Sequence, residues 1–320
     1  MRGGRVSGRY RVSDTVKLAA FTFIRKSEAL TGSPPSGLLF NKFMIMFNRR
    51  MLKQGKDIRL AHCWYRWGDE VVSYALRDIV RFNHEELLYT SVSWIGKPID
   101  DPEKYGSFDG VSAYADEFLG AYADKEGKEI LLDDVYREAP YQFQSDYKKV
   151  RENLREALSN IPVHGYRTKI LWPLFEGAMG SFPHDFDRIS PYKEDFCKVF
   201  RAAIESDADI RELYCMSEDF WFFFCYHLRL KCHYNVNAET LSHWRDVLPW
   251  ETERISWNIQ DLAYKYLRDS DDGSIKRILS ERAKRIEESD RFIDSISDEE
   301  MDRLRVMVGK DGNEQRGISS

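Results

Sequence analysis

The chain has 320 residues, and its hydrophobic fraction of 42% and aromatic fraction of 14% exclude a disordered protein and allow a sizeable core. Its 48 basic and 53 acidic side chains give a formal net charge of −5, which is not the overall charge of a nucleic-acid-binding protein. Five cysteines without regular spacing predict reduced thiols in a cytoplasmic protein, and no apolar run reaches the roughly 20 residues of a membrane-spanning helix.

Two helices are predicted near the start of the chain. Ser13 can cap the first, whose apolar stripe ends near Gly32. The second covers residues 37–55, is apolar on nearly every side and stops at Gly55. A helix of this composition is expected to lie at the buried centre of the first half.

The next segments have mixed patterns. Residues 69–82 carry apolar side chains at helical spacing, so they predict a third helix. Residues 87–95 alternate and are rich in β-branched and aromatic side chains, which predicts a short strand or hairpin edge. Residues 100–138 contain twelve acidic and four basic side chains, and they are expected to form a long acidic connection with short helices.

The second half is expected to be almost wholly helical. Residues 145–160 form a clean amphipathic pattern that the following "IPVHG" breaks, and Pro249 is expected to kink or split a later long helix. We therefore predict an all-α protein of two helical domains, with at most a small β-hairpin in the first. The predicted division is a basic flexible tail at 1–12, domains at 13–160 and 161–310, and a polar tail at 311–320.

Sequence motifs for cofactor chemistry are absent. No phosphate-binding glycine loop, dinucleotide fingerprint, nucleophile elbow or HExxH pair occurs. The run "CYHLRLKCH" places Cys225 and Cys232 on one helix face, but roughly 10 Å apart along the axis. Zinc ligands converge within about 2.3 Å of the metal, so these thiols cannot share one ion. We expect neither a metal nor a cofactor.

One alternative function is a helical metal-dependent hydrolase. The pair His184 and Asp185 has His164 twenty residues upstream, a series that phosphohydrolases of the HD type use to hold an ion that activates water. Pro183 places the pair in a loop or in the first turn of a helix, whereas those enzymes carry it within a helix. A capping aspartate beside a hydrogen-bonded histidine explains the same residues without catalysis.

A second alternative is a nucleic-acid-associated regulator. Four arginines alternate with glycine, serine and tyrosine at the N-terminus, and such a tail can follow a phosphate backbone. They are Arg2, Arg5, Arg9 and Arg11. A frayed terminus explains them equally well, and nucleic acid is not the partner we expect.

The aromatic turn in the first half predicts a structural corner that presents a binding surface. Trp64, Tyr65 and Trp67 crowd around Gly68, which permits a tight approach or a positive φ. Asp69 is expected to cap the following helix, and the two tryptophans to frame one apolar hollow. A turn that is simply core accounts for the same residues.

This order of features resembles the Panacea domain, an antitoxin-associated, SocA-like helical domain, over roughly residues 16–94. Its members carry an apolar helix with a lysine near its start, here Lys42, and a later tyrosine-glycine-proline turn before a helix. Trp67 stands here in place of the tyrosine and Asp69 in place of the proline. The resemblance implies a non-enzymatic cytoplasmic interaction module whose partner is another protein, such as a toxin that it neutralises. We expect it to dock through the Trp64–Gly68 corner and the acidic stretch at 100–138, with no membrane partner. The sequence leaves the oligomeric state open.

Overall fold

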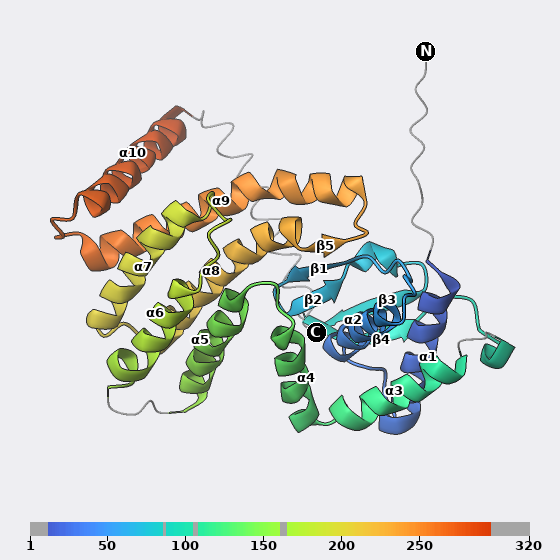
Figure 1. The fold of residues 1–320 in the computed structure, drawn as a ribbon. Helices are drawn as coiled ribbons and strands as arrows, with labels where there is room; N and C mark the ends of the chain where they lie inside the picture. The colour runs from blue at the N-terminus through green and yellow to red at the C-terminus, as the bar shows by residue number, and fades with distance from the viewer. Residues whose placement is uncertain (1–11, 86–87, 105–107, 161–164, 296–320) are drawn as a thin grey trace, which may run out of the picture.

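The computed structural model describes residues 12–295 except 86–87, 105–107 and 161–164 (Figure 1). Helices make up most of the described chain, which confirms the predicted fold class. Two small antiparallel sheets lie in the first half. The helices of the second half extend away from them toward α10 (Figure 1).

The first two helices follow their sequence signals. In α1 (Asp14–Thr31), the Ser13 hydroxyl accepts a hydrogen bond from the Val16 amide at 3.3 Å, and Gly32 ends the helix with a φ of +72°. Helix α2 (Gly37–Lys53) buries residues on most of its circumference, as its composition predicts. The Phe23 and Phe43 rings stack at 4.0 Å between the two helices.

The prediction of a helix at residues 69–82 is wrong. The chain instead forms β1 (His62–Tyr65), β2 (Gly68–Val71), a short 3₁₀ turn (Ser73–Ala75) and β3 (Val80–Glu85). Asp69 therefore lies inside a strand and caps no helix. The backbone hydrogen bonds of β2 go to β1, so contacts with distant residues override the local helical spacing.

The first sheet also recruits a strand from far along the chain. Its order is β2-β1-β5, where β5 (His233–Tyr234) pairs with His62 and Cys63. The second sheet is the hairpin of β3 and β4 (Leu88–Trp94), which confirms the strand expected at 87–95. Helices α1 and α2 both contact β4. Part of the predicted strand, residue 87, lies outside the described residues.

The acidic stretch is more regular than expected. After a 3₁₀ turn (Pro102–Lys104) it forms α3 (Phe108–Tyr122) and α4 (Lys125–Arg137), of 15 and 13 residues, so it is not a long connection with short helices. Helix α3 packs against α1, and α4 contacts β2. The apolar faces of these helices thus belong to the core of the first half.

The second half is helical as predicted. Its elements are α5 (Gln142–Ser159), a π-helical turn (Tyr166–Leu171), α6 (Trp172–Gly180), α7 (Ser190–Glu205), α8 (Ile210–Lys231), α9 (Ala238–Leu267) and α10 (Gly273–Ser295). Pro249 lies within α9, which continues through it as one helix. Helix α5 packs against α6 and α8, although the sequence places it in the first domain. The division at residue 160 stays a prediction.

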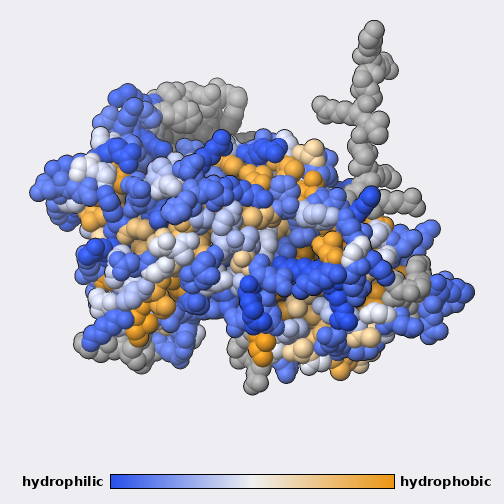
Figure 2. All heavy atoms as spheres, viewed as in Figure 1, coloured by the Kyte–Doolittle hydropathy of each residue, from blue (hydrophilic) through white to orange (hydrophobic). Residues whose placement is uncertain are grey.

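Helix α8 lies at the centre of the aromatic core of the second half. Phe220, Trp221 and Phe224 are fully buried, and the Phe196 and Phe220 rings stack at 4.5 Å. Buried apolar residues from both halves form one continuous cluster. On the face drawn in Figure 2, hydrophilic residues predominate and hydrophobic ones gather in small separate areas. Within the described chain, none of the helices has the length and apolarity required to span a membrane.

Candidate functional site

The candidate site is the β1–β2 hairpin, which lies where the two halves of the molecule meet (Figure 1). Strand β1 contacts α8, and strand β2 contacts α2 and α4. In the register of the hairpin, Trp64 lies opposite Asp69, and Tyr65 lies opposite Gly68. Arg66 and Trp67 therefore form its two-residue tip, which faces the second half.

Gly68 has the special backbone that the sequence suggested. Its φ is +90°, a conformation that residues with a side chain rarely adopt. A Cβ atom at this position would lie 2.9 Å from Cγ1 of Val135 in α4 and 3.6 Å from Nζ of Lys42. Glycine is thus required both by the backbone angle and by the close approach of α4.

A cluster of charged groups holds the hairpin on α2. Lys42 is fully buried, and its Nζ donates a hydrogen bond to the backbone oxygen of Asp69 at 2.8 Å. The Asp69 carboxylate lies 2.7 Å from Nδ1 of His62 and 3.0 Å from the guanidinium of Arg49. A buried carboxylate with two such partners fixes the strand that carries it.

The pKa values of this cluster reflect burial and mutual charge. Burial lowers the pKa of Lys42 and raises the pKa of Glu70. Burial by itself raises the pKa of Asp69, but the hydrogen bond from His62 and the charges of Arg49 and Lys42 hold it below its ordinary value. The sequence singled out Lys42 and Asp69, but not that they meet each other.

The tip is anchored to α8. The backbone oxygen of Arg66 accepts a hydrogen bond from the Trp221 indole at 3.0 Å. The Arg66 guanidinium lies 4.0 Å from the centroid of the Phe222 ring and donates to the Tyr226 hydroxyl at 3.2 Å. Tyr65 packs edge-on against Tyr226 at 5.7 Å, and burial raises its pKa. These contacts fix the turn in one position.

The two tryptophans of the corner differ in exposure. Trp64 is 7% exposed and packs edge-on against Tyr136, whereas Trp67 is 39% exposed. Trp67 lies beneath two arginines of α5, with the guanidinium carbons of Arg151 and Arg155 at 5.3 and 5.8 Å from its ring. The tryptophans pack against different elements rather than framing the single hollow expected from the sequence.

The backbone of Trp67 is also fixed by a hydrogen bond. Its amide donates a hydrogen bond to the Glu70 carboxylate at 3.0 Å. Of its two arginines, Arg151 forms a two-point ion pair with Glu218 of α8, at 2.5 and 2.9 Å. Arg155 forms no ion pair with any residue that the structure describes. The half-exposed ring therefore has a fixed position and a cation beside it.

The acidic stretch at 100–138 is a weaker docking surface than its composition suggests. Ion pairs with basic side chains of neighbouring elements occupy many of its carboxylates. They include Lys26–Asp116, Arg50–Glu117, Lys148–Asp133 and Arg49–Glu138. Much of its negative charge is thus neutralised within the molecule, so the hairpin tip is the better candidate.

The residues of the hydrolase alternative do not form a metal site within the described chain. His184 and Asp185 are exposed in the turn between α6 and α7, so the loop is the alternative that the structure bears out. Asp185 accepts hydrogen bonds from Lys231 at 2.9 Å and from the Tyr141 hydroxyl at 3.0 Å. The bond from Lys231 lowers its pKa. No group of three His, Cys, Asp or Glu side chains able to hold an ion occurs among the described residues.

The remaining sequence candidates lie elsewhere. His164, Arg2, Arg5, Arg9 and Arg11 fall outside the described residues. Cys225 is buried in α8, where burial raises its pKa, and Cys232 follows the end of that helix. Neither of these two cysteines forms a disulfide.

Comparison with known proteins adds no relative. No protein-family model, curated protein or solved structure matches this chain. The function is therefore argued from the geometry of the hairpin.

Proposed function

We propose that this chain is a non-enzymatic protein-interaction module that docks its partner at the tip of the β1–β2 hairpin. The observation that carries the proposal is Trp67, a large aromatic side chain that is 39% exposed yet held in place from several sides. Tryptophan and arginine are the residues that most often dominate the binding energy of protein interfaces. Trp67 and Arg155 stand side by side at this tip.

Rigidity of the tip favours binding. Association normally costs the ordering of side chains and loops at the interface. Here the turn backbone is hydrogen-bonded to Trp221, and the Trp67 amide to Glu70, before any partner arrives. A preformed anchor loses little further entropy, so more of the contact energy appears as affinity.

The charge of the tip indicates what kind of partner it suits. Arg155 is exposed and has no acidic partner among the residues described. A protein that presents an apolar side chain next to a carboxylate would cover Trp67 and pair with Arg155. The Panacea resemblance narrows this proposal to a toxin that the chain neutralises in the cytoplasm.

The test compares two exposed tryptophans. The partner is identified by affinity purification from the native host, purified, and titrated against wild type, Trp67→Ala and Trp250→Ala. Trp250 is 75% exposed on α9 and serves as the matched control. We expect Trp67→Ala to cost about 2 kcal/mol or more of binding energy and Trp250→Ala to cost almost nothing.

Three results would count against the proposal. They are an unchanged affinity of Trp67→Ala, an equal loss in both variants, and the absence of any partner that binds the purified chain. Thermal melting of each variant, run in parallel, separates lost binding from lost folding. Arg155→Gln should weaken binding less than Trp67→Ala, because exposed ion pairs contribute about 1 kcal/mol at most.

A further inference from the structure

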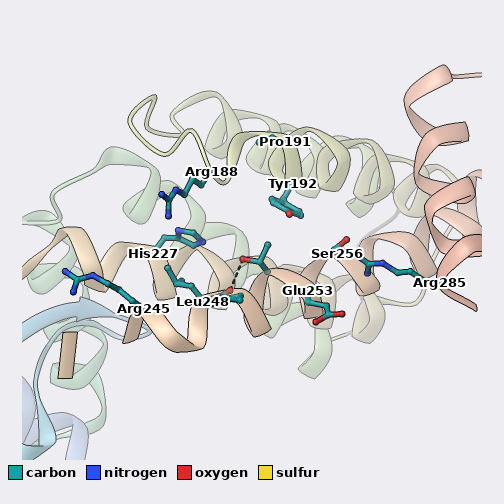
Figure 3. Close-up of a pocket in the computed structure, with 11 residues that line it drawn as sticks. Arg188, Pro191, Tyr192, His227, Arg245, Leu248, Glu253, Ser256 and Arg285 are labelled. Atoms are coloured by element: carbon teal, nitrogen blue, oxygen red, sulfur yellow. Dashed lines mark hydrogen bonds between the residues drawn. The ribbon is translucent and has the colours of Figure 1, made fainter. Parts of the chain in front are cut away.

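A groove in the second half of the molecule lies apart from the hairpin. It has a volume of about 780 Å³ and is lined by residues from the start of α7, from α8, from α9 and from α10 (Figure 3). Sites for small molecules commonly have volumes of roughly 300–1,000 Å³. Tyr192, Leu248 and Pro249 give the groove an apolar wall.

The charged lining of this groove is mostly basic. It contains three arginines, Arg188, Arg245 and Arg285, against one acid, Glu253. Figure 3 shows the Glu253 carboxylate directed away from Tyr192. Across the described ranges of the chain, none of these three arginines forms an ion pair, whereas Arg282, one turn from Arg285, is paired with Asp261 at 2.8 Å. The described lining of the groove therefore carries a net positive charge, and its arginines are not neutralised by ion pairs.

Two buried polar atoms of the lining have no hydrogen-bond partner among the described residues. They are Nε2 of His227 on α8 and Nη1 of Arg285 on α10. Buried polar groups are nearly always hydrogen-bonded, because leaving them unpaired is costly. Burial and the charge of Arg188 lower the pKa of His227 to about 4, so this imidazole is neutral near pH 7.

Arg188 and Arg285 lie at opposite ends of the groove (Figure 3). Figure 3 shows Arg188 above the His227 ring, and Arg285 reaching from α10 toward Ser256 on α9. The Arg285 guanidinium lies over the Trp257 ring at 5.2 Å, which limits its movement. A guanidinium held in this way suits a phosphate, whose oxygens match its planar set of donors.

We propose that this groove binds a small organic phosphate, with its apolar body against Tyr192 and Leu248 and its phosphate at the Arg285 end of the groove. A phosphate monoester carries a charge of about −1.5 to −2 at pH 7 and three acceptor oxygens. Those oxygens accept hydrogen bonds from the Arg285 guanidinium at that end. This site is independent of the protein-interaction surface at the hairpin.

The probe for the test is phenyl phosphate, titrated into the full-length protein by calorimetry. Phenol supplies the apolar ring alone, and inorganic phosphate supplies the anion alone. We expect phenyl phosphate to bind at one site, and each partial ligand to bind more weakly. Arg285→Gln should weaken phenyl phosphate binding by about tenfold or more, since hydrogen bonds to charged groups contribute that much.

Arg282→Gln is the matched control, because it removes the same charge from the same helix outside the groove. Should Arg285→Gln fail to fold, the comparison of phenyl phosphate with phenol in wild type decides the question, because equal affinities would show that the groove does not recognise the phosphate. Absence of saturable binding would overturn the proposal. So would equal losses in the groove variant and in Arg282→Gln, or inorganic phosphate binding as tightly as phenyl phosphate.

Discussion

Replacing Gly68 by alanine adds a single methyl group to the hairpin and tests how the corner is built. The φ of +90° is strained for any residue with a Cβ, at a cost of about 1–3 kcal/mol. The new methyl would lie 2.9 Å from Cγ1 of Val135, well inside the ordinary carbon contact distance of about 3.5–4.0 Å. Overpacking of this kind adds about 1–3 kcal/mol, so we expect a total loss of about 2–6 kcal/mol.

Urea unfolding measures this loss, and a second glycine separates its two causes. Gly32 has a φ of +72°, but a Cβ there would meet no atom within 4 Å. Gly32→Ala therefore reports the backbone strain alone. We expect Gly68→Ala to lower the free energy of unfolding by about 1–3 kcal/mol more than Gly32→Ala does.

A double variant checks the named contact. Val135→Ala removes Cγ1, so Gly68→Ala should cost less in its presence than in wild type. If Gly68→Ala costs no more than Gly32→Ala, or if its cost is unchanged by Val135→Ala, the close approach of α4 does not constrain the hairpin. The requirement for glycine at position 68 would then have another cause.

Three further predictions concern the supports of the hairpin and the first helix. Lys42→Met leaves the backbone oxygen of Asp69 without its buried donor and should lower the free energy of unfolding by about 1–3 kcal/mol in urea titrations; a variant as stable as wild type would contradict this. Because the pKa of Asp69 is lowered by folding, its contribution is present above 3.8 and lost as pH falls through the folded value. The stability gap between wild type and Asp69→Asn should therefore narrow below pH 3.8, and a constant gap would refute the ionic role. Deletion of residues 1–11 should leave the melting temperature unchanged, because Ser13 already caps α1; a fall of several degrees would show that this segment contributes to the fold.

The sequence alone predicts those elements whose signals lie within a few neighbouring residues. The cap at Ser13 and the left-handed stop at Gly32 depend on contacts between residues a few positions apart. The burial of α2 on most sides follows from the apolar composition of its own residues. The strand at Leu88–Trp94 is also evident from alternation and β-branched composition. The aromatic residues that precede Gly68 indicate from the sequence alone that this position requires a glycine.

Contacts between residues far apart in the sequence determine the strands at residues 62–85 and the candidate sites. Residues 69–82 have helical spacing, yet they form strands because the hydrogen-bonding partners of β2 lie in β1, which itself pairs with β5 far along the chain. The two candidate sites likewise depend on contacts between distant elements. Arg151 and Arg155 reach Trp67 from α5, and the basic groove draws its lining from α7 to α10. Periodicity reports which face of a segment is apolar, but which faces meet is fixed only when the whole chain packs, because that choice depends on burial shared between elements.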